Sequence, residues 1–421
     1  MGTNKRAFIS ICIVCSSIYL AGMIGPSLAY IVSSYPNVPV SSVMSLLTIP
    51  GIVAMFVSFG IGPLSLKINK KYLMLISLSS ALVYYAVFVL VGDRGPFAFL
   101  LAGACILGII RGSGSTLVNA MIGDFVEPEK RASKIALTSA ILHGGAGITA
   151  LLGGMIAAGN DGSNWPFSFL LGFISIPVMI VFAIMMPKKP DKPDLNEREV
   201  RCEKDINKDS TEKEEGHIKK GIFGIPLKVF VVIMMHFIFM ICLAAYFLNS
   251  SIYIIIEHEL GTSADAGLVG TSFTVTAVII GLTYGVWDKY IRKWIVPLSY
   301  TFAIFGFISM LIFTKTIAGI WSAAFLLSLG MNLAGPYIIS WVMSMTPTRL
   351  APVSISVYMG CMNLGMFLAP YILSFTGSFL GGGITGALRT ATILMPICVV
   401  ASLFIFTFTS GRKRQRVKSF Y

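Results

Sequence analysis

The sequence predicts an all-α polytopic membrane protein with twelve transmembrane helices, arranged as two six-helix bundles. Three observations support this fold class. The 421 residues are 55% hydrophobic and only 12% charged, about half the charged share of a soluble domain. Apolar runs of about 20 residues, long enough to cross a bilayer, recur along nearly the whole chain. The two halves of the chain also repeat one loop pattern. A water-soluble enzyme or nucleic-acid-binding protein is therefore disfavoured.

Six apolar runs precede the middle of the chain and six follow it. Lys5 and Arg6 stand before the first run, as they would at the start of a signal peptide. The stretch from Ala7 to Val32 contains no charge, however, and is too long for a cleaved segment. We therefore interpret it as the first span. The predicted spans are about residues 8–32, 41–63, 72–92, 97–122, 133–158, 166–187, 226–256, 267–287, 294–314, 317–345, 350–376 and 386–409.

The net charge of +13 is distributed as membrane topology requires. Residues 188–220 hold 10 basic and 10 acidic side chains and add nothing. The N-terminus, the loops after even-numbered spans and the C-terminal tail together carry +14, the other face carries −2, and Arg111 inside a span adds the remaining +1. The positive-inside rule therefore predicts cytoplasmic termini, in a multi-pass protein of the inner (cytoplasmic) membrane. We interpret the basic tail 412–416 as an anchor beside anionic lipid and predict no nucleic-acid partner.

The two halves of the chain, on either side of the charged segment, share a similar sequence pattern. The loop at 62–71 after span 2 matches the loop at 284–293 after span 8, so that three basic positions align. We predict an N-terminal bundle over 1–187, a charged cytoplasmic linker over 188–221, and a C-terminal bundle with its basic tail over 222–421. Two repeats facing each other across a central cavity are typical of alternating-access transporters. We expect the protein to act as a monomer.

These loops also carry motifs of a known family, whose pattern after span 2 is G-x-L-a-D-r-x-G-R-K. Leu66 takes the acidic position of this pattern and Asn69 its second glycine, while the second copy keeps the acid as Asp288 but lacks the glycines. The sequence thus resembles the major facilitator superfamily over essentially its whole length, with degenerate motifs. The glycines at 112–114 and the segment 122–131 resemble the drug-exporter-like bacterial branch. The residues that fit the first pattern are Gly62, Leu64, Ser65, Lys67, Lys70 and Lys71.

The sequence predicts no enzyme, cofactor or metal site. Cys12 and Cys15 have the spacing of a redox or metal pair, but no second Cys/His pair accompanies them and both lie in an apolar helix. The four histidines are scattered, and the chain has no phosphate-binding loop of the Walker type, so ATP is not the predicted energy source. We expect a secondary transporter driven by an ion gradient or by exchange.

Arg111 is the strongest candidate for a substrate-binding residue. It lies 13 residues before Asp124, which marks the cytoplasmic end of span 4, hence about 20 Å deep. Ser115 and Asn119 follow at helical spacing and form a polar stripe with it. No Asp or Glu falls inside any predicted span, so a buried guanidinium indicates an anion site, such as one for a carboxylate. The alternative is that Arg111 bonds backbone carbonyls and packs the bundle.

Two histidines lie within the spans. His143 in span 5 has a depth similar to that of Arg111 and is a candidate for proton coupling, because imidazole titrates near neutral pH. The alternative, a hydrogen-bonding residue that packs the helices, stays equally open. His236 in span 7 is predicted to be structural.

Charged residues at the cytoplasmic ends of the spans form a predicted gate, which the family resemblance implies would hold the inner side closed. The alternative is ordinary solvated loop charge, worth less than about 1 kcal/mol per pair. Because Leu66 lacks the family's negative charge, we predict a weak latch in the N-terminal half. The gate candidates are Asp124, Glu129, Arg131, Asp288, Lys289, Arg292 and Lys293.

The sequence therefore predicts a secondary active transporter that moves a small organic solute across the membrane. The branch resemblance favours proton-coupled efflux of amphipathic compounds by an antiporter. Arg111 and the missing carboxylates favour the alternative, uptake or exchange of an organic anion.

Overall fold

The computed structural model describes most of the chain as helix and shows no strand in the parts that it describes. The predicted linker 188–221 and the basic tail 412–416 lie outside the described residues. The described ranges are residues 2–18, 20–157, 163–187, 226–254, 259–260, 263–313, 316–347 and 350–408.

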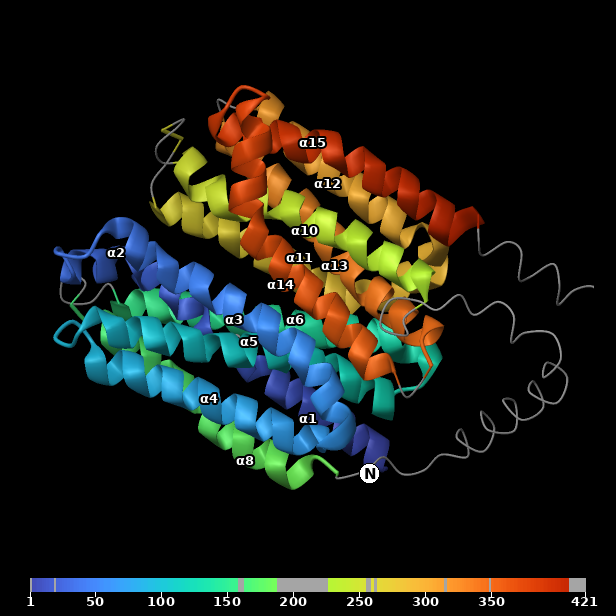
Figure 1. Cartoon of the computed structure of the whole chain (residues 1–421), viewed down its shortest axis with the longest axis horizontal. Helices are drawn as coiled ribbons and strands as arrows, with labels where there is room; N and C mark the ends of the chain where they lie inside the picture. Colours follow the sequence, from blue (N-terminus) through green and yellow to red (C-terminus); the bar gives the residue numbers. More distant parts are fainter. Residues whose placement is uncertain are drawn as a thin grey trace, which may run out of the picture.

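The first six predicted spans correspond to eight described α-helices (Figure 1). Two of these spans are interrupted. The first is divided by a 3₁₀ turn at Leu20–Met23, and the sixth contains a 3₁₀ stretch at Phe169–Ile174. Pro26 and Pro177 follow these breaks and cannot donate the backbone hydrogen bond of a regular helix. The helices are α1 (Thr3–Ile18), α2 (Ile24–Ser34), α3 (Val40–Lys67), α4 (Lys70–Val91), α5 (Phe97–Phe125), α6 (Arg131–Ala157), α7 (Trp165–Ser168) and α8 (Ser175–Met185).

The second half supplies the other six spans, each as one α-helix. Ten helical segments of the described residues are apolar and long enough to cross a membrane. This number agrees with twelve spans, because the broken first span is not counted and α11 and α12 are counted as one segment. The helices are α10 (Leu227–Ile252), α11 (Ser263–Ile291), α12 (Ile295–Ile312), α13 (Ile317–Met345), α14 (Ala351–Ser378) and α15 (Gly383–Ser402).

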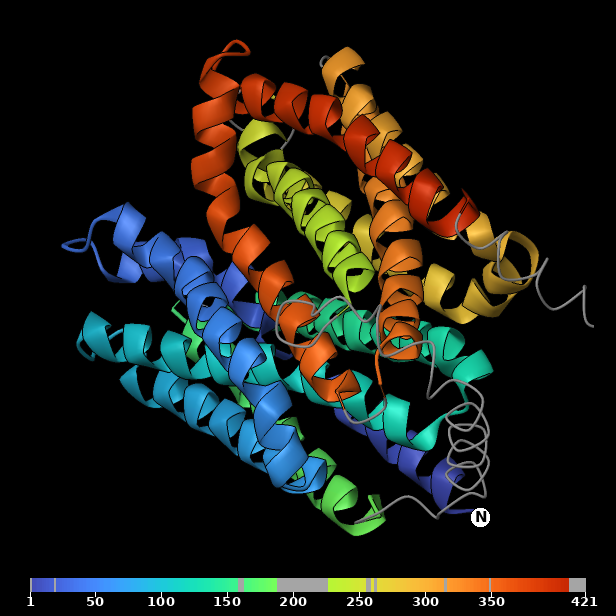
Figure 2. The same cartoon turned by 45° about the vertical axis from the view of Figure 1, so that its right-hand side comes forward.

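The helices form two bundles that meet along two helix pairs, α3 with α14 and α6 with α11. We call the end of the molecule that carries the N-terminus and the junctions α3–α4, α5–α6, α11–α12 and α13–α14 the basic end. In Figure 2, α14 lies beside α3 near the basic end, and the two helices diverge away from it. The bundles are therefore in closest contact at the basic end.

Small residues permit this contact. A Cβ atom added to Gly62 of α3 would lie 2.7 Å from the carbonyl oxygen of Pro352, on α14. A Cβ atom added to Gly281 of α11 would lie 2.6 Å from the carbonyl oxygen of Ala136, on α6. Both distances are too short for any side chain, so the two interfaces close only because these positions are glycine.

Within the N-terminal bundle, α5 packs closely on α3. A Cβ atom at Gly108 would lie 2.8 Å from the carbonyl oxygen of Pro50, and one at Gly112 would overlap the backbone of Ala54. This confirms the close helix approach expected of a Gly-x-x-x-Gly pair. Because Arg111 directly precedes Gly112, the packing fixes where the arginine leaves its helix.

Candidate functional site: a cavity between the two bundles

A cavity of about 630 Å³ lies between the bundles. Helices of both bundles line it, chiefly α3, α5 and α6 on one side and α10, α13 and α14 on the other. Most of its lining is apolar and includes five methionines, whose flexible side chains adapt to ligands of different shape. The methionines are Met240, Met331, Met359, Met362 and Met366.

The lining residues nearest the basic end are buried, whereas those near the opposite end include exposed side chains. Leu47 and Phe247, near the opposite end, are each 41% exposed. Asn119 and Ile339, nearer the basic end, are each 6% exposed, and Thr138 is 2% exposed. The cavity is therefore closed on the side of the basic end.

The three predicted substrate-binding residues all line this cavity. Arg111, Ser115 and Asn119 reach it from α5, as their helical spacing predicts. The guanidinium of Arg111 makes no hydrogen bond or ion pair with any other described residue. No aspartate or glutamate from the described part of the chain lines the cavity either. A half-buried cation that faces a cavity without a counter-charge is suited to bind an anion.

The two histidines occupy different surroundings. His143 lines the cavity from α6 and forms no hydrogen bond with another described side chain or backbone group. His236 lines the cavity from α10, and its Nδ1 atom lies 3.0 Å from the hydroxyl oxygen of Tyr300. Its ring stacks on Phe239 and Tyr358, with centroid distances of 5.0 and 5.6 Å. The predicted structural role of His236 is compatible with these contacts, but its position on the cavity wall was not predicted.

Hydrogen bonds between neutral side chains join the two bundles beside the cavity. The Nδ2 atom of Asn363 on α14 donates to Ser58 Oγ on α3 over 3.0 Å. Ser58 Oγ in turn donates to the Gly112 carbonyl on α5 over 3.0 Å. About two turns nearer the basic end along α14, Ser356 Oγ donates to the Ser58 carbonyl and accepts from Gly62 N. We call this chain, formed by Ser58, Gly62, Ser356 and Asn363, the polar seam.

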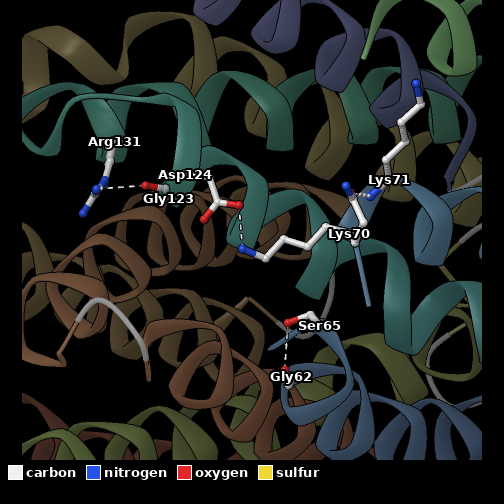
Figure 3. A network of polar contacts seen from close by, with 8 residues as sticks. Gly62, Ser65, Lys70, Lys71, Gly123, Asp124 and Arg131 are labelled. Atoms are coloured by element: carbon white, nitrogen blue, oxygen red, sulfur yellow. Dashed lines mark hydrogen bonds and ion pairs between the residues drawn. The ribbon is translucent and has the colours of Figure 1, made fainter. Parts of the chain in front are cut away.

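The predicted gate residues of the first half form their described contacts within the N-terminal bundle (Figure 3). Lys70 Nζ at the start of α4 lies 2.5 Å from Asp124 Oδ2 at the end of α5. The Arg131 guanidinium donates to the carbonyl of Gly123 over 2.9 Å and to that of Val126 over 3.1 Å. Arg131 therefore caps the C-terminus of α5, where a cation is favoured. Glu129 is exposed at the surface.

The second copy of the gate pattern is also local. Arg292 Nε lies 3.7 Å from Asp288 Oδ1, one helical turn away. Lys289 is exposed with its Nζ 5.3 Å from the ring centroid of Tyr290, and Lys293 is exposed. Every ion pair between described residues lies within one bundle. That the charged residues hold the basic end closed stays a prediction.

Among the described residues, no group of three or more His, Cys, Asp or Glu side chains could hold a metal ion. The cavity offers a cation, hydrogen-bonding groups and an apolar wall.

Comparison with known families assigns the chain. A family model described as the Major Facilitator Superfamily matches residues 9–253 and again residues 234–420. The chain belongs to the major facilitator superfamily. It is therefore a multi-pass membrane transporter, and the proteins of this family are transporters rather than enzymes. No curated protein sequence matches the chain.

Solved structures of the superfamily share its fold at low sequence identity. The human organic anion transporter MFSD10 (TETRAN) is 13% identical with a TM-score of 0.70, over 96% of this chain and 100% of that one. The proton:xylose symporter XylE is 14% identical with a TM-score of 0.71, over 96% of both chains. FucP in its outward conformation is 14% identical with a TM-score of 0.69, over 96% of this chain and 99% of that one. These similarities establish the fold alone.

Proposed function

We propose that this transporter moves a small organic anion, which binds in the central cavity at Arg111. The observation that carries the proposal is the charge of the cavity wall. Arg111 is its one permanently charged side chain among the described residues, and no acidic residue of the described chain lines the cavity to balance it. An anion would supply the missing counter-charge, while a cationic substrate would meet repulsion from Arg111 and no acidic residue to hold it.

Transport would follow from alternate opening of the two ends. The basic end is closed by the polar seam and by the glycine contacts of α3 and α11. If the positive-inside rule holds, this end is cytoplasmic and the structure represents an outward-facing state. Rocking of the bundles about the cavity would then expose Arg111 to the cytoplasm.

The apolar, methionine-rich wall supports a second function, efflux of amphipathic compounds as in the drug-exporter-like branch. In that function His143 would carry the coupled proton, since it faces the cavity and has no hydrogen-bond partner among the described residues. The two functions differ in the charge of the substrate. An amphipathic anion would satisfy both the arginine and the apolar wall.

Proteoliposome flux tests the proposal directly. Aryl sulfonates and quaternary ammonium ions of similar size keep a fixed charge and do not cross the bilayer as neutral species. We expect the wild type to transport the sulfonate, Arg111→Ala to lose at least about tenfold in rate, and Arg111→Lys to retain part of it. Arg94→Ala is the matched control, because Arg94 is 95% exposed outside the cavity. Full sulfonate transport by Arg111→Ala would contradict the anion site. Preferential transport of the cation would instead support the second function.

A further inference from the structure

His236 is placed where it can bind substrate as well as stabilise its bundle. Its ring lies between the cavity and Tyr300, and Phe239 and Tyr358 hold the ring plane by stacking. The residue is 3% exposed, and that small exposure is toward the cavity that it lines. The stacking contacts and the hydrogen bond to Tyr300 together restrict the ring, so its two nitrogen atoms point in set directions.

The hydrogen bond to Tyr300 determines which nitrogen carries the proton of the neutral ring. Tyr300 is completely buried, and its hydroxyl group has no other hydrogen-bond partner among the described residues. The hydroxyl proton is satisfied only if Tyr300 donates to Nδ1, since a buried donor without an acceptor costs free energy. A neutral imidazole that accepts at Nδ1 carries its proton on Nε2.

The Nε2–H group is therefore a preset donor that faces the cavity. Nε2 makes no hydrogen bond within the described part of the chain. Fully buried polar atoms without a partner form a short set that does not include Nε2, so this atom is not fully buried. It therefore remains accessible, and the cavity is the space that it can reach.

The position of His236 relative to Arg111 limits what can bind to both. His236 lies nine residues after Leu227, where α10 begins at the basic end, a rise of about 13 Å. Arg111 lies 14 residues before Phe125, where α5 ends at the same end, a rise of about 21 Å. The two residues thus approach the cavity from different bundles and at different depths. A ligand that contacts both must have its two polar groups several bonds apart.

We propose that His236 is a second substrate-binding residue, which donates its Nε2–H to an uncharged acceptor on the same organic anion that Arg111 holds. This inference rests on the proposed function and names the substrate class. The substrate is a monocarboxylate, since the described cavity wall has a single permanent cation, and it carries a ketone, hydroxyl or amide oxygen several bonds from the carboxylate. Such a ligand contacts both bundles at once, so its binding depends on the relative position of the two bundles. Tyr300 is a positioning residue, because it acts only through the histidine.

Two substitutions separate the roles of the two nitrogen atoms. The amide group of Asn occupies roughly the place of Nδ1, and the amide group of Gln roughly that of Nε2. His236→Asn therefore keeps the bond to Tyr300 and removes the donor in the cavity. His236→Gln keeps the donor and loses the bond. The probes are hexanoate and 5-oxohexanoate, which share a carboxylate and a chain length and differ in one ketone acceptor.

Equilibrium binding to the purified full-length protein is measured at a pH at which both acids are ionised. We expect wild type to bind 5-oxohexanoate about threefold to tenfold more tightly than hexanoate, the effect of one hydrogen bond. His236→Asn should lose this preference and bind hexanoate as before, whereas His236→Gln should keep most of it. Tyr300→Phe should reduce the preference, and the unchanged affinity for hexanoate shows that each variant is folded.

The outcomes distinguish this inference from the anion site. Suppose that both acids bind and that their affinity depends on Arg111, but that His236→Asn and His236→Gln show the same preference for 5-oxohexanoate over hexanoate. The role of His236 is then overturned and the anion site stands. If wild type shows no preference for the ketone, the role of His236 is likewise overturned. If neither acid binds to wild type, both proposals fail.

Discussion

Gly62→Ala should open the basic end of the transporter. In the structure, a Cβ atom at this position would lie 2.7 Å from the carbonyl oxygen of Pro352 and 2.7 Å from Ser356 Oγ, and it would overlap Ser356 Cβ. One contact atom belongs to the backbone and the others to a short side chain at the helix crossing. No flexible group can move aside, so α3 and α14 must separate.

The size of the effect follows from the cost of overpacking. Inserting one methyl group into a closely packed interface costs about 1 to 3 kcal/mol. This destabilisation applies only to the state with a closed basic end, because the contact is lost when the bundles separate there. The population ratio of closed to open should therefore fall by about fivefold to 150-fold.

Pulsed electron spin resonance between labels on the two bundles measures this shift. Cysteines introduced at Leu66 and Tyr290, both exposed at the basic end, carry the labels after the native cysteines are replaced. Gly60→Ala is the control on the same helix, because a Cβ atom at Gly60 meets nothing within 4 Å. The Gly62 variant should show a longer distance population that the Gly60 variant lacks. Identical distance distributions in the two variants would refute the reasoning.

Two further predictions concern the same conformational change, and a third concerns proton coupling. Asn363→Ala removes a neutral hydrogen bond across the polar seam, worth about 0.5 to 1.5 kcal/mol. It should therefore populate the longer distance between the labels on the two bundles. Asn249→Ala should not, since Asn249 bonds a carbonyl of its own helix. Leu66→Asp places a negative charge near the N-terminus of α14 and should favour the closed basic end by about 0.3 to 1 kcal/mol; unchanged cysteine labelling would contradict this. His143→Gln should abolish any dependence of flux on an imposed pH gradient while substrate binding remains. A wild-type flux that ignores the gradient would exclude His143 as the proton carrier.

The spans could be predicted from composition, because an uncharged apolar run of about 20 residues is typical of a membrane-spanning helix. Their ends could not. The predicted span 97–122 ends before α5 does, since this helix continues to Phe125. Pro26 indicates a kink site in the first span, but the complete break there and the break in the sixth span were not predicted. Pro26 and Pro177 were visible in the sequence, but a proline in a membrane helix produces either a kink or a complete break, depending on its neighbours.

The arginine side of the cavity was also predictable. A single charge within an apolar run is costly unless it faces a cavity or a partner, and helical spacing placed Ser115 and Asn119 on the same face. The structure brings all three residues to one cavity wall. Their role in binding remains a proposal.

The polar seam and the cavity face of His236 could not be predicted. Ser58 and Asn363 are 305 residues apart, and nothing in the sequence around them separates them from polar residues that bond only their own helix, such as Ser80 with the Ser77 carbonyl. The pairing depends on how the bundles pack, which local patterns do not encode. His236 was interpreted by its depth alone, and its stacking partners come from three different helices.

The charged residues and the neutral seam have different effects on motion. The Lys70–Asp124 pair ties α4 to α5, and Arg131 fixes the end of α5, so these contacts make the N-terminal bundle more rigid. They remain intact whether or not the bundles separate, because both partners move together. The contacts of Gly62, Ser356 and Asn363 exist only when the basic end is closed. Each is neutral and of moderate strength, so together they can favour a state without trapping it. A transporter must pass between its states repeatedly, and an interface of this kind keeps the two states within a few kcal/mol, where the binding of one anion can decide between them.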